Sequence, residues 1–481
     1  MTNIEIGYLY VNIQRSVLLL IFTTGEIFMQ LLLRDKNFYK TMIGIALPIA
    51  LQNLISSSLN MIDTLMITKL GEANIAAVGL ANQVFFFFVL ILFGINSGAS
   101  IFVAQFWGKR DVKNIRRILG IALIIGGALS IVFAISAFFM PKAIMRIFTK
   151  DIEVVELGIK YLRIVSISYL LTAVSFSFSV ASRSIGKANI PMLVSAIALL
   201  ANTIFNYLLI FGNFGFPQMG IEGAALATLI SRIIEIVLIL FITYISRNAL
   251  AAKPRELIDI SADFLAKFFK TTTPVILNEF FWSLGMVMYS IAYARIGKEA
   301  TATVQISTTI QNIFMVVSMG LANACAVMVG NKIGADNKEE AISYAKTFSV
   351  LGPAIGVVLG VMLYLLSPII LLLFNNLSSE VYYSARRILI VISLTMSIKI
   401  FNTILIVGIL RSGGDTKFSM FLEMGSVWLV GVPLAFLGAL VFKLPVYWVL
   451  AMVSLEEVVK AVIGIPRLLS MKWVRNVVEH M

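Results

Sequence analysis

Several acidic and amide side chains fall inside long apolar stretches, where they are costly to bury. Asp63 lies in the stretch that contains Pro48, and Asn202 and Asn206 lie four residues apart in a later one. An ionised carboxylate in an apolar helix costs free energy unless it has partners or water, so it indicates a functional site. Residues four apart share one helix face. Together with Thr228, these oxygens predict a cation-coupling site that binds Na⁺ or, through Asp63, a proton.

A second polar set lies in the other half of the chain. Glu279 follows Pro274 by five residues, and Trp282 follows Glu279 by three, on nearly the same helix face. Lys399 lies near the middle of a later apolar stretch, at a similar depth. Either group alone would become neutral in a low dielectric, so we expect Glu279 and Lys399 to form an ion pair. This pair would be either a static contact between two spans or a switch. Trp282 would offer an aromatic face to an organic cation.

The elements that position these residues must be membrane helices. The 481 residues are 59% hydrophobic and 13% charged, with a mean hydropathy of +0.95. Many apolar stretches reach 20 residues, whereas a closed β-barrel would show short alternating segments. The net charge of +13 comes from basic residues in short loops, which favours lipid headgroups over nucleic acid. One cysteine and one histidine predict neither a disulfide framework nor a structural metal site.

Twelve spans are expected, and the basic loops place both termini in the cytoplasm. Lys and Arg cluster before the first span and after spans 2, 4, 6 and 10, whereas the loop GNFGFPQMG after span 5 has none. The predicted spans are 41–66, 74–105, 118–140, 157–182, 190–212, 222–245, 268–293, 300–331, 347–374, 386–410, 417–441 and 446–466.

The chain also contains an internal repeat. RSIGKA at 183–188 corresponds to RSGGDT at 411–416, at an offset of 228. An offset of 226 pairs Pro48 with Pro274, Gly71 with Gly297, Gly94 with Gly320 and Gly108 with Gly334. Each half holds six spans, so both insert the same way, which predicts an all-α membrane protein of two six-helix bundles related by a parallel repeat. The predicted divisions are an extension at 1–34, bundles at 35–245 and 263–467, a cytoplasmic linker at 246–262 and a cytoplasmic tail at 468–481.

The first 33 residues do not form a predicted span. Residues 16–33 are apolar but contain Glu26, which makes them too short and too polar for a span, and no small-residue cleavage site follows. We interpret them as an interfacial segment or as an extension upstream of a start at Met29. Deleting residues 1–28 is expected to leave insertion and transport intact.

The ordered motifs resemble a known transporter family. They are ALPIALQN, IDTLMITKLGEANIAAVGLANQ and GASIFVAQFWG in the first half, with PVILNEFFWSLG, IQNIFMVVSMGLANACAVMVGNKIGADN and GILRSGGDTK in the second. This set resembles the multidrug and toxic compound extrusion (MATE) transporters of prokaryotes, from about Asp35 to about Arg467. The resemblance implies a secondary antiporter of the plasma membrane that expels organic cations or drugs in exchange for Na⁺ or H⁺ by alternating access. A monomer in contact with lipid, without cofactor or nucleic acid, is expected.

The resemblance also implies roles for the polar residues. MATE proteins of this type place an acid, an asparagine, a second acid and a threonine where this chain has Asp63, Asn202, Asn206 and Thr228. Asn206 thus replaces an acid, which favours proton exchange at Asp63 over a tight cation site. The family often has a coupling or substrate-binding carboxylate at the position of Glu279, and some members have an acid near Lys399.

Two other classes of function remain as alternatives. A lipid-intermediate flippase of a related transporter class would need a strongly basic central cavity, which one lysine beside one glutamate does not make. A membrane enzyme would need a paired aspartate motif or HExxH, and a primary pump would need GxxxxGK[ST]; the chain contains none of these. The sequence therefore predicts a transporter and not an enzyme.

Overall fold

The computed structural model describes residues 36–372, 374, 378–479 and 481, except for the side chains at 59 and 60. The described residues form helices and loops, with no strand among them, which confirms the all-α membrane fold. The predicted extension at 1–34 lies outside the described residues. Ten of the helices are each long and apolar enough to cross a membrane, and a bent pair provides an eleventh crossing.

The N lobe comprises the helices from α2 to α9. They are α2 (Lys36–Thr68), α3 (Glu72–Gly108), α4 (Val112–Phe139), α5 (Pro141–Phe148), α6 (Ile152–Val165), α7 (Ser168–Ser184), α8 (Asn189–Phe211), η1 (Asn213–Gly215) and α9 (Ile221–Ile245). The predicted span 157–182 is not one straight helix, because α6 and α7 meet at an angle of 51°. The hydroxyls of Ser166 and Ser168 donate to carbonyls three residues back, an alternative to helical bonding that favours a bend here.

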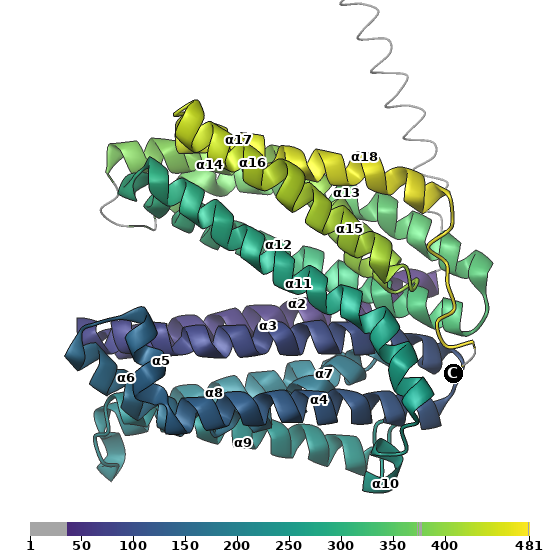
Figure 1. The fold of residues 1–481 in the computed structure, drawn as a ribbon, viewed down its shortest axis with the longest axis horizontal. Helices are drawn as coiled ribbons and strands as arrows, with labels where there is room; N and C mark the ends of the chain where they lie inside the picture. The colour runs from purple at the N-terminus through teal and green to yellow at the C-terminus, as the bar shows by residue number, and fades with distance from the viewer. Residues whose placement is uncertain (1–35, 373, 375–377, 480) are drawn as a thin grey trace, which may run out of the picture.

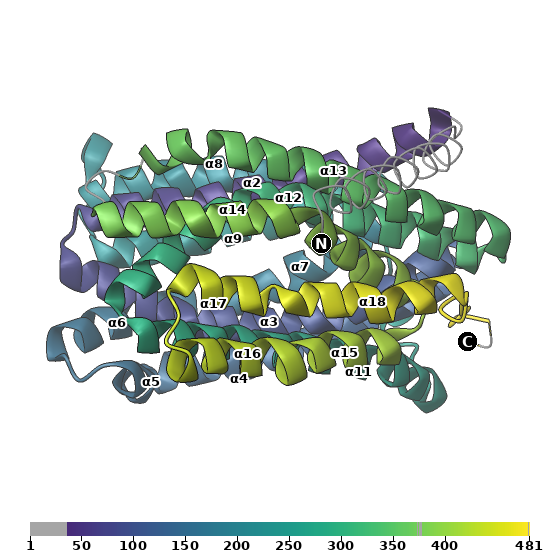
Figure 2. The same ribbon diagram turned by 90° about the horizontal axis from the view of Figure 1, so that it is seen from above.

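The C lobe comprises the helices from α11 onward. They are α11 (Ala262–Ile296), α12 (Lys298–Gly334), α13 (Lys338–Leu372), α14 (Ser379–Thr403), η2 (Ile404–Arg411), α15 (Thr416–Ser426), η3 (Val427–Gly431), α16 (Val432–Phe436), η4 (Leu437–Val441), α17 (Val446–Val453) and α18 (Leu455–Leu469). We assign α17 and α18, which lie end to end, to the predicted twelfth span (Figure 2). The start of α2 and the C-terminal tail lie at the same end of the molecule (Figure 2).

Two turns show how the repeat is built locally. Gly71 lies between α2 and α3 with φ at 101°, and its counterpart Gly297 lies between α11 and α12 with φ at 153°. Side chains with a Cβ rarely adopt such values, so glycine is required at both turns. The paired glycines found in the sequence are therefore equivalent turns in the two lobes.

The first helix of each half begins in the opposite lobe. In Figure 1 the N lobe lies below and the C lobe above, and α11 runs obliquely between them. Phe38, near the start of α2, packs edge-on against Tyr344 of α13, with ring centroids 4.9 Å apart. Phe268, near the start of α11, packs against Phe102 of α3 at 5.6 Å. The buried core of each lobe therefore includes the opening turns of a helix from the other half of the sequence.

The lobes pack closely at the end of the molecule where α10 (Pro254–Leu257) lies, which we call the linker end (Figure 1). A Cβ added to Gly108 would lie 1.9 Å from the carbonyl oxygen of Asn331, and one added to Gly334 would lie 1.8 Å from that of Gln105. These two glycines are related by the repeat. Glycine is therefore needed at both positions for α3 and α12 to approach one another.

The C-terminal tail also joins the lobes at this end. Trp473 is fully buried and packs with the core of the C lobe, whereas the buried Val478 packs with a core of the N lobe. Gln105 of α3 accepts a hydrogen bond from the backbone N–H of Val477 at 2.9 Å and donates to the carbonyl of Ser412 at 2.9 Å. The residues predicted as a tail are thus part of the packed structure.

The linker between the lobes is attached to α4 by ion pairs. Arg116 donates to Glu256 at 2.6 Å, and Arg117 is hydrogen-bonded to Asp259. A backbone N–H from Lys253, with help from Arg116, holds the pKa of the Glu256 carboxyl below its usual range. The hydrogen bond from Arg117 does the same to the pKa of Asp259. The predicted polar linker is therefore fixed to the N lobe.

Candidate functional site

The N lobe brings three of its four predicted site residues into contact. Asn206 of α8 donates its Nδ2 to Oδ1 of Asp63 at 2.6 Å and to Oδ1 of Asn202 at 2.9 Å. Both asparagines are 1% exposed, whereas Asp63 is half-buried. The Oδ1 of Asn206 and the Nδ2 of Asn202 have no partner among the described residues. One carboxylate with unsatisfied amides beside it can bind a proton and change its hydrogen bonds as it does so.

Thr228, the fourth predicted residue, bonds elsewhere. Its hydroxyl donates to the carbonyl of Ala224 at 3.0 Å, one turn back in α9. The buried hydroxyl of Tyr161 lies within hydrogen-bonding reach of Thr228 and interacts electrostatically with Asp63. Tyr161 is therefore a neighbour of both Thr228 and Asp63, which the sequence did not reveal.

The sequence analysis also missed a cation near Asp63. Arg232 of α9 interacts electrostatically with Asp63 and donates to Glu235 at 2.5 Å. Opposite charges three residues apart inside an apolar stretch were the available signal. Asp63 thus has a cationic neighbour, but that neighbour is itself bonded to another acid.

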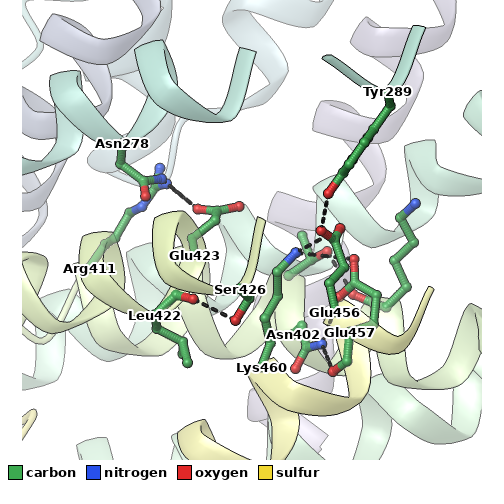
Figure 3. Close-up of polar contacts among 12 residues, drawn as sticks. Asn278, Tyr289, Asn402, Arg411, Leu422, Glu423, Ser426, Glu456, Glu457 and Lys460 are labelled. Carbon is green, nitrogen blue, oxygen red and sulfur yellow. Dashed lines mark hydrogen bonds and ion pairs between the residues drawn. The ribbon is translucent and has the colours of Figure 1, made fainter. Parts of the chain in front are cut away.

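In the C lobe, the predicted pairing of Glu279 with Lys399 is wrong. Arg411, at the end of η2, donates Nη1 to Oε1 of Glu279 at 2.6 Å. Its Nη2 lies 3.3 Å from Oε2 of Glu423, which also accepts from the side chain of Asn278 (Figure 3). The side chain of Arg411 is 4% exposed, and those of Glu279 and Glu423 are 12% and 17% exposed. Two carboxylates therefore share one guanidinium, and with both carboxylates ionised the group carries a formal net charge of −1.

The sequence analysis assigned neither Glu423 nor Arg411 to a site. Glu423 lies inside the predicted span 417–441, where an acid again was the available signal. Arg411 was found only as the first residue of the repeated motif RSGGDT. A guanidinium is planar and presents several donors, so it can hold two carboxylates where one ammonium fits less well.

Trp282 and Lys399 lie apart from this ion pair. Trp282 is 37% exposed, and Lys399 is half-buried on α14. Lys399 interacts electrostatically with Glu456 and Glu457 of α18, two acids inside the predicted twelfth span. Lys399 therefore belongs to a separate group of charges in the C lobe.

The N lobe contains a counterpart of the Arg411 group that has no carboxylate. Arg183 donates to Oε1 of Gln52 at 2.6 Å, and Gln52 donates to the hydroxyl of Ser195 at 2.9 Å. The repeat offsets of 226 and 228 relate Gln52 to Asn278, Arg183 to Arg411 and Ser195 to Glu423. Equivalent residues therefore lie together in both lobes, but their bonds differ: Arg183 bonds to the amide of Gln52, whereas Arg411 bonds to the carboxylates of Glu279 and Glu423.

The amino-acid sequence matches a family model and several bacterial proteins. The family model MatE matches the chain twice, at residues 48–208 and 274–437, which together make up more than half of it. The "Probable multidrug resistance protein NorM" of Thermotoga maritima is 23% identical over 444 residues, covering 91% of this chain and 94% of that protein. The "Uncharacterized transporter YisQ" of Bacillus subtilis is 25% identical over 448 residues, with 92% and 96% covered.

Solved structures share the fold. One described as the "Outward-facing conformation of a multidrug resistance MATE family transporter of the MOP superfamily" superimposes with a TM-score of 0.81 at 20% identity, covering 92% of this chain and 98% of that one. A transporter of the MOP superfamily from Pyrococcus furiosus gives the same TM-score, identity and coverage. The two matches of the family model begin 226 residues apart, which agrees with the repeat read from the sequence.

Proposed function

Because the chain belongs to the MatE family of multidrug and toxic compound extrusion transporters, we propose that it exports organic cations or drugs in exchange for H⁺ or Na⁺. The observation that carries this proposal is the presence of membrane-embedded carboxylates in both lobes, in two different settings. Asp63 is bonded to an amide, whereas Glu279 and Glu423 share Arg411 and leave an excess negative charge.

The two settings suit two tasks. Asp63 has an uncharged hydrogen-bond partner, so taking up a proton there breaks no direct ion pair, which suits ion coupling. The C-lobe group keeps one uncompensated carboxylate charge, which suits recognition of a cation. We therefore assign coupling to Asp63, with Asn202, Asn206 and Thr228, and substrate recognition to Glu279 and Glu423.

The proton is favoured over Na⁺ as the coupling ion. A tight Na⁺ site needs several oxygen ligands with sufficient negative charge. Here Asn206 directs an N–H, and not an oxygen, at Asp63. We also assign the protein to the plasma membrane, as a monomer with both termini in the cytoplasm.

The state described here fits an outward-facing conformation. The lobes pack together through Gly108 and Gly334 at the linker end, which the basic loops predict to be cytoplasmic. In Figure 1 their helices diverge toward the opposite end. A lipid-intermediate flippase is less well supported, since an acidic excess beside Arg411 disfavours lipid phosphates.

A vesicle assay tests the proposal. The purified protein is reconstituted, loaded with the fluorescent organic cation ethidium, and given either a pH gradient or a Na⁺ gradient of equal size. We expect ethidium transport with the pH gradient, and little with the Na⁺ gradient. Transport that depends on neither gradient would remove the antiporter, and translocation of a lipid-linked phosphate without ethidium transport would favour the flippase.

A further inference from the structure

A second group of buried charges lies in the C lobe, away from Arg411. Lys460 of α18 lies 3.3 Å from a carboxylate oxygen of Glu456 and 3.3 Å from one of Glu457. These three residues are between 4% and 9% exposed. With Lys399 nearby, two cations balance two acids. We call these four residues the α18 cluster.

The α18 cluster corresponds to the Asp63 group through the repeat. The offset of 226 relates Asp63 to Tyr289, and the offset of 228 relates Thr228 to Glu456 and Arg232 to Lys460. The hydroxyl of Tyr289 donates to Oε2 of Glu456 (Figure 3). In the C lobe the acid, Glu456, lies in the last span and the hydroxyl, of Tyr289, lies in the first. In the N lobe the acid, Asp63, lies in the first span and the hydroxyl, of Thr228, lies in the last.

The surroundings of Glu456 are shaped to hold this contact. A Cβ added to Gly431 would lie 1.9 Å from the hydroxyl oxygen of Tyr289 and 2.4 Å from Oε2 of Glu456. Gly431 thus leaves the room in which the two groups meet. Asn402, 2% exposed, donates to Oε2 of Glu457 at 2.7 Å, and its own Oδ1 accepts from no described residue.

These contacts favour a proton over a metal ion as the species that binds. The ammonium of Lys460 already occupies the space between the two carboxylates, where a metal ion would have to bind. The described part of the chain also contains no group of three His, Cys, Asp or Glu residues arranged to hold a metal. A proton needs no such space.

The partners also decide which acid takes the proton. As the side chains lie, Glu457 faces the amide N–H of Asn402 and the ammonium of Lys460, which both donate, so a protonated Glu457 would find an acceptor only after the Asn402 amide rotated. The hydroxyl of Tyr289 can donate to an ionised Glu456 or accept from a protonated one. Protonation at Glu456 therefore keeps a hydrogen bond, and forms only an O–H bond on the carboxylate.

We propose that Glu456 is a second proton site, in the C lobe, whose occupancy controls how strongly Glu279 and Glu423 bind a cation. Within the cluster, Lys399 of α14 faces the two acids of α18, and the charged or titratable groups that face the cluster from other helices are Tyr289 and Tyr293 of α11 and Glu423 of α15. Glu423 interacts electrostatically with Lys460 and belongs to the Arg411 group, so it connects the two.

A count of charges gives the expected effect. The α18 cluster is neutral and the Arg411 group carries −1, so their sum is −1. Protonation of Glu456 brings the sum to zero and removes the attraction for a cation. This part rests on the proposed function, because it takes the substrate to be an organic cation.

Infrared spectroscopy tests the proton site without any substrate. The protein is placed in lipid nanodiscs as Asp63→Asn, which removes the N-lobe acid, and difference spectra are recorded between pH 5 and 9. We expect a carbonyl band from a protonated carboxyl group that Glu456→Gln removes. Tyr289→Phe should keep the band and move its midpoint to higher pH, because ionised Glu456 loses a donor. Glu380→Gln, at the exposed start of α14, is the control and should change nothing.

Binding of tetraphenylphosphonium in the same nanodiscs tests the control of substrate affinity. In Asp63→Asn, acidification should weaken binding by roughly tenfold, the effect of one unit charge about 10 Å away at an effective dielectric near 20. Adding Glu456→Gln should fix binding at the weak level at every pH. A carbonyl band that survives Glu456→Gln overturns the proton site. A Glu456 band without pH-dependent binding overturns the coupling, and no binding at any pH counts against the proposed substrate class alone.

Discussion

Arg183 and Arg411 occupy equivalent positions in the two lobes, but only Arg411 is bonded to carboxylates. Arg183 donates to the amide oxygen of Gln52, whereas Arg411 lies between Glu279 and Glu423. The Nε atoms of both arginines are buried without an acceptor among the described residues. A guanidinium is therefore present at the same position of the repeat in both lobes, but its hydrogen-bond partners differ.

This difference predicts unequal effects on stability. Arg411→Met leaves two carboxylates without their counterion, and an uncompensated buried charge costs about 3–5 kcal/mol. Arg183→Met leaves only the amide oxygen of Gln52 unpaired, at about 1–3 kcal/mol, since the amide nitrogen keeps its bond to Ser195. Thermal unfolding in detergent should therefore show a larger drop in Tm for Arg411→Met. Equal drops would mean that the carboxylates do not depend on Arg411 for their charge balance.

The proposed division of roles between Asp63 and Glu279 can be separated by two substitutions. Asp63→Asn should abolish transport driven by a gradient and leave binding measurable, because the ionisable group is lost from the coupling site. Glu279→Gln should weaken binding of cations by about ten- to a hundredfold, the loss of one charged contact, and affect neutral analogues less. Ethidium flux and equilibrium binding are the two measurements. If Asp63→Asn transports normally while Glu279→Gln loses ion dependence, the roles are reversed.

Replacing Asn206 by an acid should create sensitivity to Na⁺. The Nδ2 of Asn206 lies 2.6 Å from Asp63, so Asn206→Asp places two carboxylates in contact and makes a bound cation favourable. We expect Na⁺ to raise the Tm of Asn206→Asp above its value in K⁺, through binding to the folded state. Asn323→Asp, on α12, is the matched control. A wild-type protein that responds to Na⁺ as strongly would contradict the preference for a proton.

The attachment of the linker should depend on pH. Its bonds to Arg116 and Arg117 hold the pKa values of Glu256 and Asp259 below their usual range. A lowered pKa means that the attachment is present above the ordinary carboxyl range and is lost as the pH falls through the lowered values. A spin label at Arg255→Cys should stay immobile down to about pH 4 and become mobile below it. The buried Cys325 is the one other cysteine, so labelling is selective.

In Glu256→Gln combined with Asp259→Asn, the label should be mobile at every pH. A label that responds to acid in this variant would show that other groups release the linker.

The fold and the repeat could be predicted from the sequence because both depend on patterns along the chain. Hydropathy locates spans, and glycines that recur at the offset of 226, such as Gly71 and Gly297, show which positions of the two halves correspond. The bend at Ser166 was not predicted, because a serine bonded to its own helix leaves hydropathy unchanged. The Asp63 group was found because Asn202 and Asn206 are spaced by one helical turn.

The partner of Glu279 could not be predicted in the same way. Lys399 and Arg411 lie 12 residues apart on one continuous helical segment, and depth along that segment does not tell which of them faces α11. The π-helical turns of η2 rotate the segment away from ordinary helical spacing before it reaches Arg411. The acids Glu423, Glu456 and Glu457 were visible in the sequence, and their importance became clear only from their contacts.

The exchange of opening turns between the lobes has a consequence for how the chain is assembled. The N-lobe core contains Phe264 and Phe268 from the second half, and the C-lobe core contains Phe38, Met42 and Ile45 from the first. Synthesis of the first half alone therefore leaves the N-lobe core without Phe264 and Phe268, and it exposes the apolar start of α2, whose binding surface lies in the second half. If the chain is divided within 246–262 and the two halves are produced together, each half provides the core residues that the other lacks. We therefore expect the two halves together to form a complete transporter, which neither half forms alone.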